Sequence, residues 1–307
     1  MKEITILCPI FNEQENIELF IKNFTQIFKN HPNYKFSILF ADNASSDSSN
    51  QLLKNICKEN KDIKYIRYLK NNGVMKSIFT AIKYVDTEAC AIFDCDLQDD
   101  PKLLTEFIKN WELNNKIVYG KRTKRKEIFF LGFLRNVFKK LSEILRGYKI
   151  EIESGAWFLD KEVIDEIKNL EYDPFLPALI NNLNFKSKGI DYERNERKRG
   201  LSKFNFFNYL SYAADGLVSG TIKPLRISIY FSFLFALISF FSAIYFLIAK
   251  FYLGIVYPEG VAAIIIINLV SFTLIFLFFG ILGEYIGKIY LKDDNKKTPK
   301  INEKINL

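Results

Sequence analysis

Short apolar runs alternate with longer segments of helical periodicity from residue 4 to residue 119. The apolar runs are expected to be strands, at residues 4–10, 36–41, 63–68, 89–94 and 117–119. The intervening segments are expected to be helices, at residues 13–29, 46–60, 74–85 and 101–115. This alternation predicts an α/β fold with a mainly parallel sheet and helices on both faces.

Two stretches late in the chain, residues 227–249 and 261–283, contain no charged residue. Each holds 23 residues, whereas a helix that crosses the hydrocarbon core of a bilayer needs about 20 apolar residues. We therefore predict a hairpin of two transmembrane helices. Lys and Arg are frequent on the outer flanks of both spans, and the connecting loop holds one Lys and one Glu. The positive-inside rule then predicts that both chain termini face the cytoplasm and that the loop faces outward.

The spans divide the chain into four expected parts. These are an N-terminal domain at residues 1–200, an interface helix and linker at 201–226, two transmembrane helices at 227–289, and a cytoplasmic tail at 290–307. Within the tail, residues 293–307 are expected to be disordered because they are polar. Residues 129–146 combine Phe and Leu at helical spacing with Lys and Arg, which suits a helix on a membrane surface or, equally, a helix packed on the core. The first apolar run is too short for a signal peptide, so the N-terminal domain is expected to remain cytoplasmic.

The formal net charge of +8 suits a protein that lies on an anionic leaflet of a lipid bilayer and holds phosphate groups. A nucleic-acid partner is not expected, because the sequence has membrane spans and no recognition motif. The single histidine, His31, makes His-based metal sites and catalytic triads improbable. Gly-x-x-x-Gly spacings at residues 216–220 and 283–287 would allow close helix contact, so a homo-oligomer stays open. The four cysteines lack metal-type spacing and are expected to be reduced packing residues: Cys8, Cys57, Cys90 and Cys95.

Polar residues follow the ends of the first four predicted strands, and in a parallel α/β sheet ligands bind beyond those ends. The clusters are Asn12-Glu13, Asp42-Asn43, Asn71-Asn72-Gly73 and Asp94-Cys95-Asp96. An extended strand end would point Asp94 and Asp96 to the same face. Two carboxylates on one face suit Mg²⁺ or Mn²⁺, which complete their coordination with water and substrate phosphates. The sequence therefore predicts a site for a nucleotide diphosphate.

Several motifs appear in an order that is found in one known family. They are Pro9-Ile-Phe-Asn-Glu13, Asp42-Asn-Ala-Ser45-Ser-Asp47, Asp94-Cys-Asp96-Leu-Gln98-Asp99 and Arg197-Lys-Arg-Gly200-Leu-Ser202-Lys203. With these motifs, from residue 4 to residue 292, the chain resembles membrane-anchored, inverting family-two glycosyltransferases that load a sugar onto a polyprenyl phosphate. The resemblance implies a GT-A (Rossmann-like) fold, a UDP- or GDP-linked sugar as donor and undecaprenyl phosphate as acceptor. It also implies a multi-pass protein of the cell inner membrane that serves the cell envelope.

The resemblance assigns roles to individual residues. Asp94 and Asp96 are the expected metal ligands, and together with Arg122 they are the expected catalytic residues. Glu13 and Asp42 would accept hydrogen bonds from the base or the ribose. The basic residues would hold phosphates, although a solvated basic face on an anionic membrane is the alternative. The expected substrate-binding residues are Pro9, Phe11, Glu13, Asp42, Gln98, Arg125, Arg194, Arg197, Ser202 and Lys203.

Three positions depart from the family pattern: Asn43 and Ala156 each replace an Asp, and Pro177 replaces an Arg. Ala156 matters most, because the Asp at that place is a candidate catalytic residue in relatives. A phosphate monoester is already largely ionised at pH 7, with a second pKa of about 6, so such an acceptor needs positioning more than a general base. Asp99 and Asp100 are candidate helpers. Two alternatives remain, namely a glycosyltransferase that acts on another lipid and a non-catalytic membrane scaffold that keeps the fold.

Overall fold

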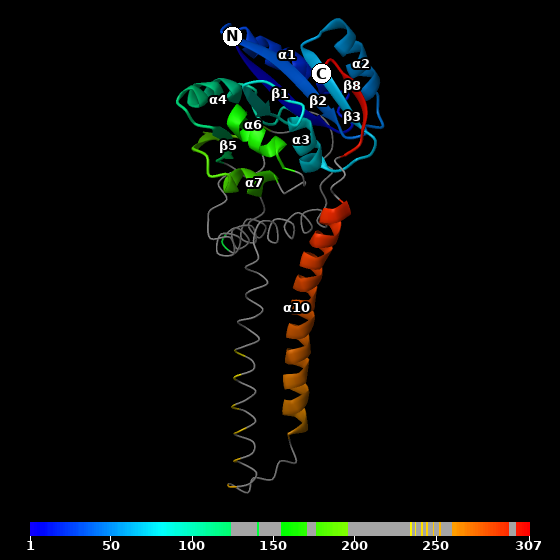
Figure 1. The fold of residues 1–307 in the computed structure, drawn as a ribbon, viewed down its shortest axis with the longest axis vertical. Helices are drawn as coiled ribbons and strands as arrows, with labels where there is room; N and C mark the ends of the chain where they lie inside the picture. Colours follow the sequence, from blue (N-terminus) through cyan, green and yellow to red (C-terminus); the bar gives the residue numbers. More distant parts are fainter. Residues whose placement is uncertain are drawn as a thin grey trace.

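One twisted sheet forms the core of the domain at one end of the molecule, and a long helix extends away from that domain (Figure 1). A computed structural model describes residues 1–123, 155–170, 176–195, 260–294 and 299–307. It also describes the isolated positions 140, 234, 237, 241, 244, 248 and 252. Arg125, Arg197, Ser202 and Lys203 lie outside these residues, as do nearly all of the segments 129–146 and 201–226.

The strands and helices predicted before residue 120 are confirmed, with shifts at their ends. The strands are β1 (Lys2–Ile10), β2 (Tyr34–Asp42), β3 (Ile63–Tyr68), β4 (Ala89–Ile92), β5 (Ile117–Arg122), β6 (Trp157–Asp160), β7 (Ser187–Tyr192) and β8 (Ile301–Ile305). The helices are α1 (Ile17–Phe28), α2 (Ser49–Glu59), α3 (Val74–Ile82), α4 (Leu103–Glu112), α6 (Lys161–Lys168), α7 (Leu176–Asn182) and α10 (Val261–Asp294).

The strand order in the sheet is β7-β5-β6-β4-β1-β2-β3-β8. β1 runs parallel to both β2 and β4, β2 runs parallel to β3, and β5 runs parallel to β7. Only β6 and β8 pair antiparallel with their neighbours among the described strands. The prediction of a mainly parallel sheet is therefore confirmed. The register pairs Ile10 with Asp42, and Asp42 with Arg67, so these strands end together at one edge.

Helices cover both faces of the sheet, as predicted. Because successive strand residues point to opposite faces, Ile6 of β1 enters one apolar cluster and Leu7 enters the other. The first cluster is built with α1, α2 and α4, and the second with α3, α6 and α7. All four cysteines are buried and unpaired, in agreement with the reduced packing role expected for them.

The C-terminal tail corrects one expectation, because residues 301–305 form strand β8 rather than a disordered segment. β8 pairs with β3, which would otherwise end the sheet with an open edge. Ile305 packs against the first apolar cluster and Ile301 against the second. Pairing with β3 and the packing of these two isoleucines hold the segment in the sheet, although its three central residues are polar.

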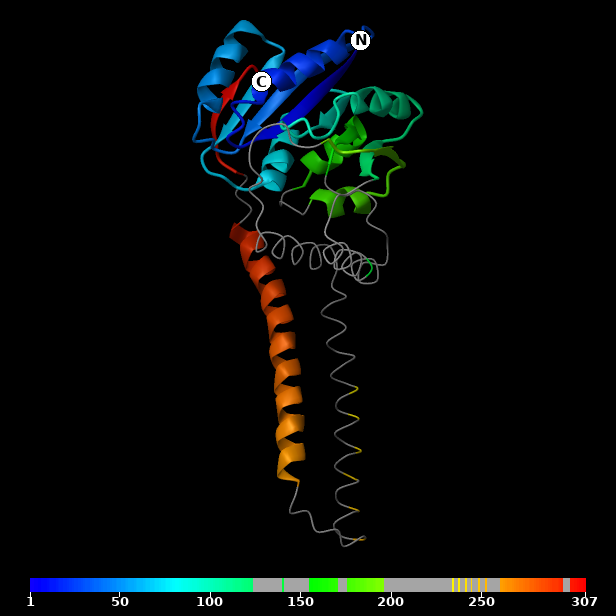
Figure 2. The ribbon, with the colours of Figure 1, turned by 180° about the vertical axis from the view of Figure 1, so that it is seen from behind.

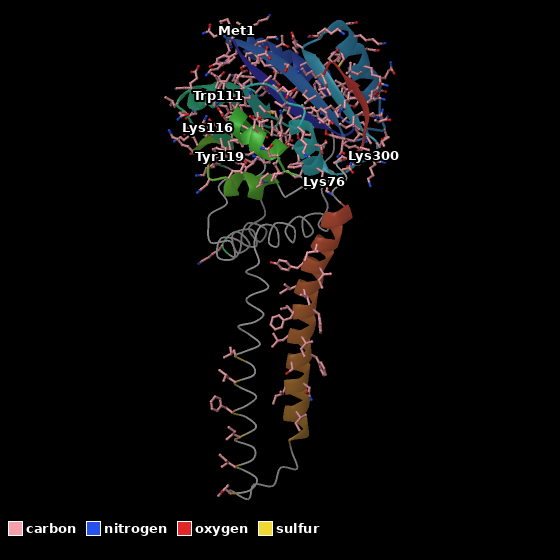
Figure 3. The ribbon with its side chains drawn as sticks, viewed as in Figure 1. Met1, Lys76, Trp111, Lys116, Tyr119 and Lys300 are labelled. Atoms are coloured by element: carbon pink, nitrogen blue, oxygen red, sulfur yellow. The ribbon has the colours of Figure 1, made fainter. Side chains whose placement is uncertain are left out.

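α10 projects from the domain on the side where Lys76 and Lys300 lie, whereas Met1 lies at the opposite side (Figures 2 and 3). The second predicted span is thus helical over its whole length. Within the described ranges, however, no helix meets the length and apolarity required to cross a membrane. The first predicted span lies almost entirely outside the described residues.

Candidate active site

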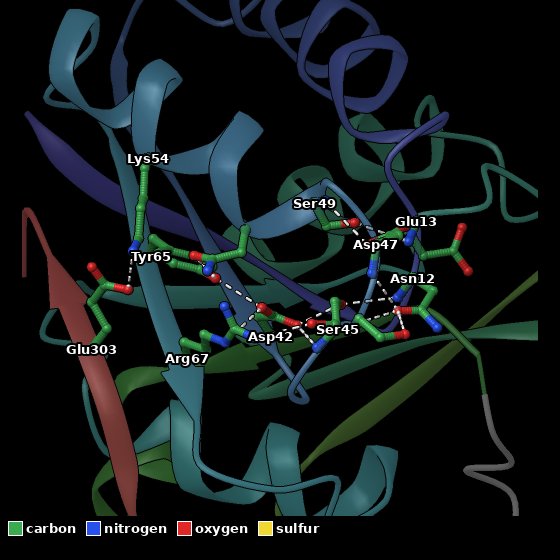
Figure 4. A network of polar contacts seen from close by, with 12 residues as sticks. Asn12, Glu13, Asp42, Ser45, Asp47, Ser49, Lys54, Tyr65, Arg67 and Glu303 are labelled. Carbon is green, nitrogen blue, oxygen red and sulfur yellow. Dashed lines mark hydrogen bonds and ion pairs between the residues drawn. The ribbon is translucent and has the colours of Figure 1, made fainter.

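The loops after β1 and β2 are joined by hydrogen bonds that involve Asn12 (Figure 4). The Asn12 backbone is in the left-handed region, with φ of 57°. Its N–H donates to Ser45 Oγ at 2.9 Å, and its Oδ1 accepts from the Ser46 N–H at 2.7 Å. The Glu13 N–H donates to Ser49 Oγ at 3.2 Å, at the start of α2. These bonds give the edge of the sheet a defined shape before any ligand arrives.

Asp42 is buried at the centre of this edge and is held by protein groups (Figure 4). Its Oδ1 accepts from the Ser45 N–H at 2.8 Å and from Ser45 Oγ at 2.5 Å. Its Oδ2 accepts from the Tyr65 hydroxyl at 2.7 Å and lies 3.8 Å from Arg67 Nε. Burial, and then the charge of Asp42, raise the pKa of Tyr65 well above its ordinary value, so this phenol remains a donor. Both oxygens therefore orient the loop, which the sequence did not predict.

Asn43 gains a structural explanation. Its Nδ2 donates to Asn71 Oδ1 at 2.8 Å, and its Oδ1 accepts from the Asn72 N–H at 2.9 Å. Asn71 Oδ1 also accepts from the Gly73 N–H at 2.9 Å, in the turn before α3. A carboxylate at position 43 could not donate to Asn71, because it carries only acceptor atoms. Asn43, which departs from the family pattern, thus forms an amide pair with Asn71 on the neighbouring loop.

Asp94 and Asp96 lie in the loop that follows β4, which ends at Ile92. The Gln98 N–H donates to Asp96 Oδ1 at 3.1 Å, which tightens the loop. Asp94 Oδ2 lies 3.5 Å from Arg194 Nη2. Desolvation by the surrounding groups, followed by the charges of Asp99 and Asp96, raises the pKa of Asp94 to about 7, although 42% of its side chain is exposed, and Arg194 partly opposes this rise. The predicted acidic pair is therefore close to a positive charge from a distant segment.

A second group of charges surrounds Asp99. Asp99 Oδ1 accepts from the Tyr192 hydroxyl at 2.5 Å and from Arg194 Nε at 3.1 Å, and it lies 3.7 Å from Arg122 Nη2. Arg122 Nε donates to the Tyr192 oxygen at 3.1 Å. The parallel register of β5 and β7 places Arg122 beside Tyr192. Burial, and then the charge of Asp99, raise the pKa of Tyr192 above its ordinary value.

Sequence reasoning expected Arg122 and Arg194 to bind phosphate, and the structure brings them together around Asp99. The sequence did not indicate a role for Tyr192, whose only signal is its position two residues before Arg194. Gln98 is joined to the same segment, because the Asn195 N–H donates to its carbonyl oxygen at 2.9 Å.

The remaining predicted residues lie in or just after β1, or close to β6 and α4. Pro9 is buried within β1, and the Glu13 carboxylate accepts from Asn16 Nδ2 at 2.6 Å. Phe11 follows β1 and is half-buried. Ala156 is buried just before β6, where its carbonyl oxygen accepts from the Gly120 N–H at 2.9 Å. Among the described residues, the Asp100 carboxylate accepts a hydrogen bond only from the Lys102 N–H, at the start of α4, and takes no part in the ion pairs of Asp99.

The acidic pair is compatible with a divalent cation. Within the described ranges, no three His, Cys, Asp or Glu side chains converge on one point. Mg²⁺ commonly takes one or two protein carboxylates together with substrate phosphates and water. Asp94 and Asp96 supply two such carboxylates in the loop after β4, so they could hold Mg²⁺ or Mn²⁺ together with a phosphorylated substrate.

Comparisons with known proteins identify the family. The profile described as Glycosyl transferase family 2 matches residues 5–168. The chain is 31% identical to "Putative glycosyltransferase CsbB" of Bacillus subtilis (strain 168), over 96% of this chain and 89% of that protein. It is 28% identical to "Bactoprenol glucosyl transferase" of Shigella phage SfV, over 97% of each chain. It is 29% identical to "Uncharacterized glycosyltransferase YkcC" of Bacillus subtilis (strain 168), over 97% of this chain and 92% of that protein.

The profile covers more than half of the chain, and the similarity to the Bacillus and phage proteins extends over almost all of it. Three of the four motifs that carried the resemblance in the sequence, including the acidic pair of the β4 loop, fall within residues 5–168, and the Arg197–Lys203 motif lies beyond them. The chain therefore belongs to glycosyl transferase family 2, and it is a glycosyltransferase.

Proposed function

We propose that this glycosyltransferase moves a sugar from a UDP- or GDP-linked donor to a polyprenyl phosphate such as undecaprenyl phosphate, with inversion at the anomeric carbon. The observation that carries the proposal is the convergence of the Asp94–Asp96 loop with Arg122 and Arg194 at one edge of the sheet. Such an edge combines ligands for a metal with cations for phosphate. The similarity to a protein named "Bactoprenol glucosyl transferase", over 97% of both chains, supports a polyprenyl phosphate as acceptor.

The donor is proposed to lie across the edge of a GT-A domain. Asp94 and Asp96 would hold Mg²⁺ or Mn²⁺. Such an ion, when bound, would offset negative charge on the departing nucleotide. The loops after β1 and β2, which the hydrogen bonds of Asn12 and Asp42 hold in place, would bind the nucleoside next to Phe11. Asp42 would act there through the loop that it orients, because both its oxygens already have protein partners.

The acceptor phosphate is proposed to attack the anomeric carbon directly. A new bond forms between that carbon and a phosphate oxygen, while the bond between the carbon and the nucleotide oxygen breaks. Because the acceptor is already ionised, no carboxylate is required at Ala156 to remove a proton. Arg194, together with the predicted residues Arg125, Arg197, Ser202 and Lys203, would hold the phosphate of the acceptor or the diphosphate of the donor.

We also propose that two C-terminal segments anchor the enzyme in a membrane. The apolar segments 227–249 and 261–283 would anchor the enzyme as a hairpin in the cell inner membrane, with the catalytic domain and both termini in the cytoplasm. A lipid acceptor supports this location, since its phosphate lies at the bilayer surface. Association into a homo-oligomer stays a prediction.

The test uses the full-length protein in membranes, with labelled UDP- and GDP-sugars and undecaprenyl phosphate. We expect a lipid-linked labelled sugar with at least one donor, and its loss on EDTA treatment and in Asp96→Ala. Asp86→Ala is the matched control, because Asp86 is an exposed carboxylate paired only with Lys168 among the described residues. Diacylglycerol in place of undecaprenyl phosphate tests the alternative lipid acceptor. The absence of product with every donor, from folded protein that binds nucleotide, would refute the proposal and favour the scaffold.

A further inference from the structure

The most unusual charged group among the described residues is Asp99. Its side chain is 0% exposed, although it lies between two arginines that retain access to solvent. Three separate segments meet at it: the loop after β4, the end of β5 with Arg122, and the end of β7 with Tyr192 and Arg194. A buried carboxylate that joins three segments can determine how the side chains of all three are oriented.

The two oxygens of Asp99 are used unequally. Oδ1 receives the Tyr192 hydroxyl and the Arg194 guanidinium, and it is the oxygen nearest to Arg122. Oδ2 is buried and has no hydrogen-bond partner in the described part of the chain. A buried acceptor without a partner is destabilising. An ion pair that served folding alone would be expected to satisfy both oxygens, so the arrangement favours the orientation of the arginines over stability.

The arginines keep donors for another anion. A guanidinium carries five N–H donors. Arg122 directs Nε to Tyr192 and Nη2 toward Asp99, and Arg194 directs Nε to Asp99 and Nη2 toward Asp94. The Nη1 groups of both make no hydrogen bond with the described residues. Two guanidiniums anchored by one buried carboxylate form a rigid fork of the kind that binds phosphate in a bidentate manner.

We propose that Asp99 is a positioning residue for phosphate recognition, which holds Arg122 and Arg194 together beside the Asp94–Asp96 loop. The proposal rests on the proposed function, because the phosphate is that of the nucleotide donor or that of the lipid acceptor. Asp99 itself touches neither substrate. Without its charge, the two guanidiniums repel each other and lose their common anchor, so the fork opens.

The first experiment measures binding by isothermal titration in Mn²⁺, with full-length protein in detergent. The probes are UDP and GDP, and uridine and guanosine as their phosphate-free counterparts. Asp99→Asn keeps the shape of the side chain and removes its charge. We expect the affinity for the diphosphate to fall by about 10- to 100-fold, the range for losing a charge-assisted hydrogen bond. The affinity for the nucleoside should change less than about twofold, since only the phosphates contact the fork.

Two further variants keep the test decisive. Asp100→Asn makes the same chemical change one residue away, in a carboxylate that contacts only the Lys102 N–H among the described residues, and should bind like the wild type. Tyr192→Phe removes one bond to Asp99 but keeps its charge, and should weaken diphosphate binding by a few-fold. It provides the answer if Asp99→Asn fails to fold.

The kinetic arm separates the two sources of phosphate. A raised KM for the nucleotide sugar with an unchanged KM for undecaprenyl phosphate assigns the fork to the donor, and the reverse assigns it to the acceptor. Equal losses for diphosphate and nucleoside would overturn the positioning role while leaving the proposed function intact. The same holds if Asp99→Asn keeps both wild-type diphosphate binding and a wild-type KM for undecaprenyl phosphate. Wild-type protein that binds no nucleotide diphosphate and forms no product would remove both.

Discussion

The docking of the C-terminal strand β8 depends on Asn306, the residue that follows it. The Asn306 backbone is left-handed, with φ of 60°. Its Nδ2 donates to the carbonyl oxygens of Cys57 at 2.7 Å and Ile63 at 2.9 Å. The Cys57 carbonyl belongs to the last turn of α2, where helix carbonyls lack partners within the helix. One side chain therefore joins the tail to both a helix end and the start of β3.

The magnitude follows from these contacts. Asn306→Ala removes the two short neutral hydrogen bonds, each worth about 0.5–1.5 kcal/mol, so about 1–3 kcal/mol of docking free energy is lost. It also removes the longer contacts of Nδ2 with the Asn60 carbonyl oxygen at 3.4 Å and of Oδ1 with Lys61 Nζ at 3.3 Å. It also places a Cβ-bearing residue without a local hydrogen bond in the left-handed region, which costs about 1 kcal/mol more. We expect a total loss of about 2–4 kcal/mol. Asn306→Gly is the matched control, because glycine loses the same bonds but tolerates the backbone conformation.

The assay is hydrogen exchange of the amides of residues 301–305 in the full-length protein, which reports the free energy of local opening. At about 1.4 kcal/mol per tenfold, these amides should exchange about 30- to 1,000-fold faster in Asn306→Ala than in the wild type. Asn306→Gly should fall between the two, and amides of β1 should not change. Equal exchange in Asn306→Ala and wild type would refute this account of the docking, and equal exchange in the Ala and Gly variants would refute the role of the backbone angle.

Two further substitutions test the site. Asn43→Asp would place a carboxylate oxygen against Asn71 Oδ1, in a contact that is now 2.8 Å long, and should destabilise the fold by about 1–3 kcal/mol in a thermal unfolding experiment; an unchanged melting temperature would contradict the role of the amide pair. Gly120→Ala would bring a Cβ within 2.6 Å of Tyr192 Cε1 and displace that ring from its bond to the buried carboxylate. The affinity of the Gly120→Ala variant for UDP or GDP in Mn²⁺ should therefore fall, as is expected for Asp99→Asn. Wild-type affinity would contradict the proposed fork.

Much of the site was visible in the sequence because short motifs follow strands. The Asp94–Asp96 loop and the Asp42 loop were expected at the same edge, and the parallel register of β1, β2 and β4 confirms that expectation. Arg122 was expected as a catalytic residue and Arg194 as a substrate-binding residue, each in a basic cluster that could hold phosphate. Their common partner could not be read from the chain, since a motif does not show that the Asp99 side chain is buried while its neighbour Asp100 contacts α4.

The C-terminal strand failed as a prediction for a different reason. Its five residues are too few and too polar for a local signal, and its stability comes from β3, which lies more than 230 residues earlier in the chain. Only a completed sheet creates the open edge on which such a segment can pair.

The amino-acid sequence by itself determined the alternation of strands and helices, the parallel sheet, the acidic loop and the family, because apolar periodicity and short motifs are local properties of the chain. The tertiary structure alone decided that Asp42 is enclosed by Ser45 and Tyr65, that Asp99 gathers two arginines, and that the tail joins the sheet. Each of these depends on burial and on contacts between distant segments. Such contacts exist only after the sheet has brought those segments together.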